Sequence, residues 1–246
     1  MKSNNPNTKN AIIAGVTRER TLMSSTRKHA MAAGVLYLIT FVSIPTLILY
    51  RSVHGAKYIM EPGSDNSMII GGILEIIVAL ACIGSAVALY PVLKKKNEGL
   101  ALGLVGFRVL EAGTIFVGVM CLLTVVTLRQ SAAGSAYLAT SKTLVIMYDR
   151  IFFIGQSFVP AINDILLGIM LYHSRLVPRS LSLLGLVGGP ILIIGDVCVL
   201  LGLIGQRDNV TGLFAVSVAL FEFLFGIYLI VKGFKSTIED DENQPK

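Results

Sequence analysis

Six long apolar stretches fill most of the chain and are separated by short polar segments. A helix needs about 20 apolar residues to cross the hydrocarbon core of a bilayer. The pattern therefore predicts an all-α fold, a polytopic transmembrane helical bundle of six spans. The expected spans are Ala30–Tyr50, Met68–Leu93, Gly99–Leu128, Val145–Tyr172, Leu181–Leu203 and Leu213–Val231.

The polar segments at the two ends of the chain predict its domain organisation. Residues 1–26 are rich in Asn, Ser, Thr and charge, which is typical of a disordered tail, and residues 235–246 form an acidic tail. Residues 27–234 are expected to form one transmembrane domain. Six spans within 246 residues leave no room for a soluble domain of ordinary size.

Composition and charge placement agree with a membrane protein and predict its orientation. Hydrophobic residues make up 54% and charged residues 15% of the chain, against about 25% charged in soluble domains. The net charge is +6, but most basic residues fall in the loops on one side of the predicted spans. Basic loops stay cytoplasmic, so we expect both termini in the cytoplasm and a multi-pass protein in the cell membrane. The lipid bilayer is then its main partner, and nucleic acid is not an expected partner.

The cysteine, histidine and lysine positions argue against the common membrane cofactors. No lysine lies deep in a span, where a retinal Schiff base would need one. The cysteines have no CxxC spacing and read as buried structural thiols rather than disulfides or metal ligands; they are Cys82, Cys121 and Cys198. The histidines fall at or outside span ends, which disfavours a buried haem; they are His29, His54 and His173. We therefore expect no cofactor and no metal.

Charged residues inside the predicted spans are the strongest functional signal. Each costs several kcal/mol in a bilayer, so such residues normally face a bundle interior or an aqueous cavity. At about 1.5 Å of rise per residue, four of them fall in one layer near the midplane, and Arg108 and Glu111 share a helix face because they are three residues apart. With one neighbouring amide, the candidate ligand-binding residues are Arg108, Glu111, Asn163, Asp164 and Glu222.

A second, outer pair of intramembrane acids lies nearer the external surface. It consists of Glu75 and Asp196, with Asp149 and Arg150 as candidate neighbours. For this pair we favour hydrogen bonding between helices over a functional role.

Prolines inside three spans predict kinks, which occur both beside cavities and as packing features; they are Pro45, Pro160 and Pro190.

The balance of intramembrane charge leaves two interpretations open. Five acids face one arginine, so several of the acids must be neutral at pH 7. Acids in this situation can carry protons or bind a cation or an amine ligand. In the alternative, Arg108 neutralises one acid while protonated acids hydrogen-bond helix to helix.

Small-residue spacings at Gly99/Gly103 and Gly185/Gly189 predict close helix packing, with self-association as a further hypothesis.

Several ordered blocks of sequence resemble a known family. They are Arg27–Gly34 with Tyr37–Phe41, Leu74–Glu75 with Ala79–Gly84, Pro91–Lys94 with Asn97–Gly99, Arg108–Ala112, Ser174–Arg179 with Leu184–Gly189, and Val231–Phe234. Together they resemble the bacterial integral membrane proteins of the domain of unknown function 4386 family, over roughly Arg27 to Phe234. The resemblance implies a polytopic helical membrane protein of a prokaryote. It carries over no activity, substrate or cofactor.

Three functional hypotheses follow. The favoured one is a protein that binds or translocates a small ligand, proton or cation through a midplane polar pocket, for transport or sensing. The first rival is a structural or regulatory subunit that packs its glycine faces against a partner protein or a second copy of itself. The least favoured is a membrane-embedded enzyme acting on lipids, because the sequence has no recognisable nucleophile–base or metal-ligand set.

Overall fold

The computed structural model describes residues 25–61, 63–131 and 136–235, and all regular elements within these ranges are helices. The two tails expected from the sequence lie almost wholly outside the described residues. The first described helix begins at Ser25, inside the range 1–26 that we assigned to the first tail. Residues 25 and 26 therefore belong to the first span.

The structure confirms six helices long and apolar enough to cross a membrane. Their ranges are Ser25–Leu49, Asn66–Leu93, Glu98–Gln130, Leu138–Ser174, Arg179–Leu200 and Asn209–Val231. Four spans are single helices: α4 (Asn66–Leu93), α5 (Glu98–Gln130), α8 (Arg179–Leu200) and α9 (Asn209–Val231). Two short elements follow span one, namely η2 (Ser52–His54) and α3 (Ala56–Met60). Most of the structure is thus a set of helical hairpins with short connections.

Spans one and four are interrupted, and a proline lies at each interruption. Span one passes from a helix over residues 25–39 through the 3₁₀ turn η1 (Thr40–Ser43) into α2 (Thr46–Leu49), which Pro45 precedes. Span four consists of α6 (Leu138–Phe153), the π-helical turn η3 (Ile154–Phe158) and α7 (Val159–Ser174). Pro160 has no N–H for the preceding turn, which favours such local rearrangement. By contrast, α8 continues through Pro190.

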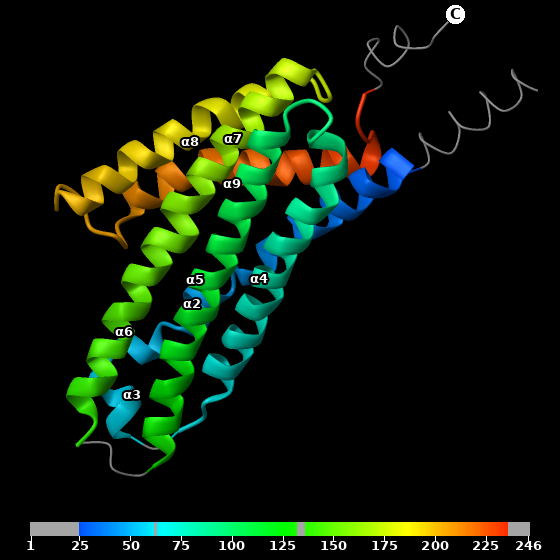
Figure 1. Cartoon of the computed structure of the whole chain (residues 1–246). Coiled ribbons are helices and arrows are strands. Elements are labelled where there is room, and N and C mark those ends of the chain that lie inside the picture. The colour runs from blue at the N-terminus through cyan, green and yellow to red at the C-terminus, as the bar shows by residue number, and fades with distance from the viewer. Residues whose placement is uncertain (1–24, 62, 132–135, 236–246) are drawn as a thin grey trace, which may run out of the picture.

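The six spans close into one bundle. Along the chain α4 packs on α5, α5 on α6 and α7, α7 on α8, and α8 on α9. The first helix completes the circuit, because Gly34 lies against Gly226 of α9 and Leu36 against Gly84 of α4. Figure 1 shows α4, α5 and the α6–α7 span side by side, with the α8–α9 hairpin inclined across them.

Both described ends of the chain lie at one end of the bundle, which we call the terminal end (Figure 1). Arg27 fixes them together by donating hydrogen bonds to the carbonyl oxygens of Leu229, at 2.8 Å, and Ile230. An apolar core contributed by all six spans lies there and includes Tyr37, Leu89 and Phe225. The cytoplasmic location of this end stays a prediction from the charge pattern.

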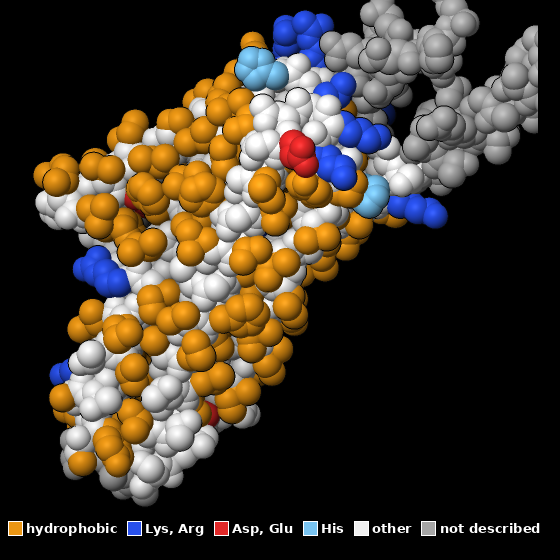
Figure 2. Space-filling model, in the orientation of Figure 1, with side chains coloured by type: hydrophobic (Ala, Val, Ile, Leu, Met, Phe, Trp, Pro, Cys, Tyr) orange, Lys and Arg blue, Asp and Glu red, His pale blue; other side chains and the backbone are white. Residues whose placement is uncertain are grey.

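The outer surface of the bundle suits lipid rather than water. Large apolar side chains on the spans are strongly exposed, among them Leu102 at 60%, Met120 at 58% and Ile194 at 59%. Figure 2 shows such side chains over the visible helical surface, with Lys and Arg gathered mostly near the terminal end. Soluble monomers rarely expose apolar patches of this extent. The chain is therefore a multi-pass membrane protein.

At the opposite end, which we call the far end, Asp65 joins three segments of the chain. Its Oδ1 accepts hydrogen bonds from the Tyr58 hydroxyl (2.8 Å) and Arg129 Nη1 (2.6 Å), and its Oδ2 accepts one from Gln130 Nε2 (3.1 Å). Burial raises the pKa of Asp65, but these hydrogen bonds and the Arg129 charge outweigh burial and hold the pKa below its usual value.

This arrangement predicts a pH-dependent effect for Asp65→Asn. The folded-state pKa lies below the unfolded value of about 3.9, so the stabilisation is complete above that value and is lost as pH falls through the folded pKa. We expect the variant to lose about 1 kcal/mol at pH 7 and to match the parent protein in strong acid. Thermal unfolding in lipid nanodiscs at both pH values measures this. An equal deficit at both would contradict it.

Candidate functional site

The guanidinium of Arg108 lies at the centre of the bundle and joins α5 to α9. The residue is 1% exposed. Its Nη1 donates to both carboxylate oxygens of Glu111, at 3.3 and 3.2 Å, and its Nη2 donates to Glu222 Oε1 at 2.5 Å. The guanidinium carbon also lies 4.8 Å from the centroid of the Tyr37 ring, a cation–π distance. Arg108 therefore ties spans one, three and six together.

Two further side chains hold Glu111 in place. Asn163 Nδ2, from α7, donates to Glu111 Oε2 at 2.7 Å, and Cys82 Sγ, from α4, donates to Oε1 at 3.4 Å. Each carboxylate oxygen of Glu111 thus accepts from Arg108 and from a second helix. We name the whole group the central cluster; it comprises Tyr37, Cys82, Arg108, Glu111, Asn163, Asp164 and Glu222.

Asp164 is the exception within the central cluster. It is 0% exposed, and neither of its carboxylate oxygens has a hydrogen-bond partner in the part of the chain that the structure describes. It lies close enough to Glu222, Arg108 and Glu111 to interact electrostatically with all three. Buried polar groups are normally hydrogen-bonded, so an unpaired carboxyl group marks a place where the network is incomplete.

The local sequence explains why these polar side chains point inward. On α5 the buried positions include Leu104, Arg108, Glu111 and Ile115, which recur at helical spacing along one face. On α9, Glu222 lies between the buried Phe221 and Phe225. The charged side chains therefore lie on the same helix faces as the apolar side chains that pack between the helices. When these faces are buried on folding, the charged side chains are buried with them.

The structure brings all five of the predicted midplane residues into the central cluster, as described above. It also adds Tyr37 and Cys82, which the sequence analysis missed as site residues. A tyrosine well inside a span, rather than at its end like Tyr90 or Tyr172, was the available signal for Tyr37. Cys82 gave none, because an isolated cysteine behaves as a small apolar residue.

The outer acids Glu75 and Asp196 bond to different partners. Glu75 accepts a hydrogen bond from the Tyr148 hydroxyl at 2.8 Å, between α4 and α6. Asp196 accepts one from Ser157 Oγ at 2.7 Å, between α8 and η3. Each of these acids therefore has its own hydroxyl donor on span four, and no hydrogen bond or ion pair joins the two among the described residues.

The two candidate neighbours of the outer acids bond elsewhere, which corrects our expectation for them. Asp149 pairs with Arg207 at 2.6 Å and with His54 at 3.1 Å, and Arg150 donates to Gln206 at 3.5 Å. Asp149 is half-buried and Arg150 is exposed, and their partners lie in η2 and in the connection between α8 and α9.

The three cysteines are free thiols, with Cys82 and Cys121 buried and Cys198 half-buried. The close packing predicted at Gly99/Gly103 is not observed, because a Cβ on Gly99 would meet only Asn97 Oδ1 of its own helix cap, at 3.6 Å, and one on Gly103 would lie 3.9 Å from the Leu166 side chain. The face formed by Gly185 and Gly189 does serve packing within the chain. A Cβ on Gly185 would lie 2.7 Å from the Phe221 ring, and one on Gly189 would lie 2.5 Å from the carbonyl oxygen of Ala161. These two glycines therefore let α8 approach α9 and α7.

Comparison with known proteins adds a family and nothing more specific. The family model described as "Domain of unknown function (DUF4386)" matches residues 32–233, a range that includes the whole central cluster. No match was found among curated proteins or among solved structures.

Proposed function

The chain is a multi-pass membrane protein that belongs to the DUF4386 family, and we propose that its central cluster takes up and releases protons as part of a transport or sensing function. The observation that carries the proposal is Asp164, a fully buried carboxyl group without a hydrogen-bond partner among the described residues, beside an arginine that is already shared by two glutamates.

Charge balance supports proton binding. If Glu111, Asp164 and Glu222 were all ionised, Arg108 would neutralise only one of the three carboxylates. Burying the remaining two charges would cost far more than folding provides. The cluster therefore needs added positive charge in its resting state, and that charge must be removable if more than one of these acids is to ionise.

A proton fits this requirement better than a metal ion or an amine. A metal cation needs several oxygens directed at one point, whereas both oxygens of Glu111 and Oε1 of Glu222 already accept hydrogen bonds from Arg108 or Asn163. The fixed charge of Arg108 would also repel a second cation placed beside it. A proton needs a single carboxylate oxygen, and Asp164 offers two.

The position of the cluster supports coupling between protonation and movement. Its residues come from five of the six spans, so a change of charge alters contacts among most of the bundle. Asn163 and Asp164 also lie about one helical turn after Pro160, in the helix that follows η3 in span four. A π-helical turn leaves the helix room to shift its hydrogen-bond register, so α7 is suited to respond when Asp164 gains or loses a proton.

Infrared spectroscopy of the protein in nanodiscs tests the proposal. Protonated carboxyl groups have a C=O stretch separate from that of carboxylates. We expect the parent protein to lose such a signal as pH rises from about 6, where exposed carboxyl groups are already ionised. In Asp164→Asn this loss should shrink by one carboxyl group. The matched control is Asp208→Asn, at the exposed connection between α8 and α9, which should retain the full signal.

Two results would reject proton exchange at this site. One is a parent protein whose protonated-carboxyl signal stays constant over the range in which it remains folded. The other is an Asp164→Asn variant with the same pH-dependent loss as the parent and as the Asp208→Asn control. Circular dichroism on the same samples verifies that each variant keeps its helical content.

A further inference from the structure

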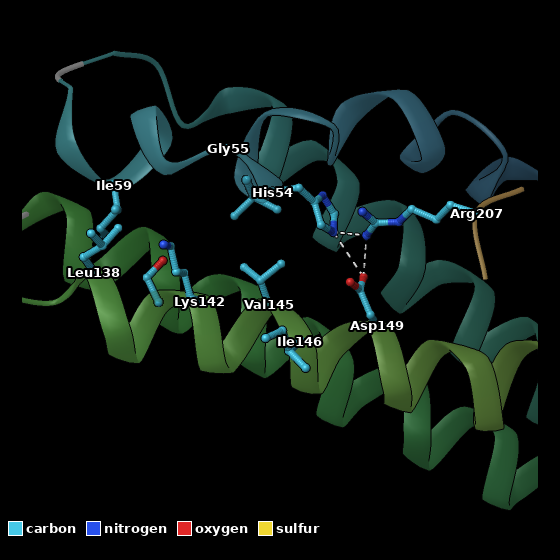
Figure 3. A pocket seen from close by; sticks show the side chains of 11 residues that line it. His54, Gly55, Ile59, Leu138, Lys142, Val145, Ile146, Asp149 and Arg207 are labelled. Carbon is cyan, nitrogen blue, oxygen red and sulfur yellow. Dashed lines mark hydrogen bonds and ion pairs between the residues drawn. The ribbon is translucent and has the colours of Figure 1, made fainter. Parts of the chain in front are cut away.

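A cavity separate from the central cluster lies at the far end of the bundle. It has a volume of about 260 Å³ and lies between α6 and the segment that holds η2 and α3, with Arg207 reaching in from the α8–α9 connection. Figure 3 shows His54, Asp149 and Arg207 directed at one another at one end of this pocket, with Lys142 near Ile59 and Leu138 at the other.

One face of α6 forms the floor of the pocket. Lys142, Val145 and Asp149 all line it at helical spacing, and seven residues of rise separate Lys142 from Asp149 by about 10 Å. The floor is thus charged at both ends and apolar between them. Its size is just below the usual range of sites for drug-sized ligands, so it suits one small polar group.

The charges of the pocket leave one cation unneutralised. Asp149 Oδ1 accepts from Arg207 Nη2 at 2.6 Å and lies 3.1 Å from His54 Nε2, while Arg207 also contacts His54. Asp149 and Arg207 therefore neutralise each other. The side chain of Lys142 makes no hydrogen bond or ion pair with the residues that the structure describes. The pocket has a net positive charge located at Lys142.

The pocket also borders the lipid-facing surface. Ile146 lines it and is 60% exposed, and its neighbour Met147 is 46% exposed. Both lie on a membrane span near the end of the bundle, where acyl chains meet headgroups. A ligand that fills this pocket therefore has an anionic group for Lys142 and an apolar part that can leave over Ile146.

We propose that this pocket binds the headgroup of an anionic phospholipid, with the phosphate at Lys142 and the acyl chains passing over Ile146. An ammonium group binds phosphate as a compact point charge, and Ser141, the neighbouring residue that lines the pocket, supplies a hydroxyl group. The same side chains would also bind the phosphate group of a soluble organic compound. The experiment must therefore distinguish a lipid phosphate from a soluble one.

Native mass spectrometry of the detergent-solubilised full chain, with phosphatidylglycerol and phosphatidylcholine added at equal concentration, tests the site. We expect the parent protein to retain phosphatidylglycerol preferentially. Lys142→Gln should reduce that preference by about fivefold, the effect of one basic residue at a membrane surface, and Lys142→Arg should keep it. Lys57→Gln is the matched control, because Lys57 is exposed at the same end but does not line the pocket.

Three outcomes would overturn the proposal. Equal retention of the two lipids by the parent protein would remove the anionic preference. An equal loss in Lys142→Gln and Lys57→Gln would show a general surface charge effect and not a site. Displacement of bound phosphatidylglycerol by equimolar glycerol phosphate would assign the pocket to a soluble phosphate instead of a lipid.

Discussion

Arg108→Gln is expected to destabilise the folded protein by about 3–5 kcal/mol, the usual cost of removing one partner from a buried ion pair. The substitution removes the one cation of the central cluster and leaves Glu111 and Glu222 without their shared donor. It also removes the contact with the Tyr37 ring. Thermal or denaturant unfolding in nanodiscs at neutral pH measures the loss.

A second substitution distinguishes lost charge balance from lost packing. In the double variant Arg108→Gln/Glu222→Gln one unpaired carboxylate is gone, so part of the lost stability should return, although Glu222→Gln alone should destabilise the parent. The matched control is Arg150→Gln, which replaces an exposed arginine with a single contact to Gln206 and should change stability by less than about 1 kcal/mol. Equal effects of Arg108→Gln and Arg150→Gln would show that the central ion pairs contribute nothing to the fold.

Gly189→Ala is expected to have the second-largest effect, about 1–3 kcal/mol. A Cβ at this position would lie 2.5 Å from the carbonyl oxygen of Ala161 and 2.6 Å from the Ile165 side chain. The backbone of α7 cannot move aside as a flexible side chain could, so α7 and α8 must separate. The matched control is Gly113→Ala on α5, where a Cβ would meet nothing within 4 Å; it should be neutral or stabilise by up to about 1 kcal/mol.

The same pair of variants addresses the hypothesis of a subunit that packs its glycines against a partner. Because Gly189 faces α7 of its own chain, Gly189→Ala should weaken the monomer at every protein concentration. If the variant instead kept monomer stability while a crosslinkable assembly was lost, the glycine face would act between chains. Analysis by crosslinking and unfolding of the same samples separates the two results.

The ion pair between Arg108 and Glu222 also holds α9 against α5. Glu222 is 114 residues from Arg108 along the chain, and their hydrogen bond joins α9 to α5 across the bundle. A proton transferred to Glu222 would weaken that bond and leave α9 held mainly by α8 and the first helix.

The sequence alone determined the number of spans and their approximate limits, and it predicted the layer in which the intramembrane charges lie. Span length and depth follow from local hydropathy, because each helix must by itself present enough apolar side chains to the lipid. The pairing of Arg108 with Glu111 was also local, since three residues of helix place them on one face.

Only the tertiary structure decided which residues share that layer as neighbours. Asn163, Glu222, Cys82 and Tyr37 reach Arg108 and Glu111 from four other spans. Contacts between helices depend on how each helix is rotated about its axis, and close packing of side chains and glycines fixes that rotation. The sequence could group Glu75 with Asp196 only by depth. The rotation of the helices decides their partners, and it gives each of them a separate hydroxyl donor. Hydropathy sets a residue's depth in the membrane, and packing sets its neighbours.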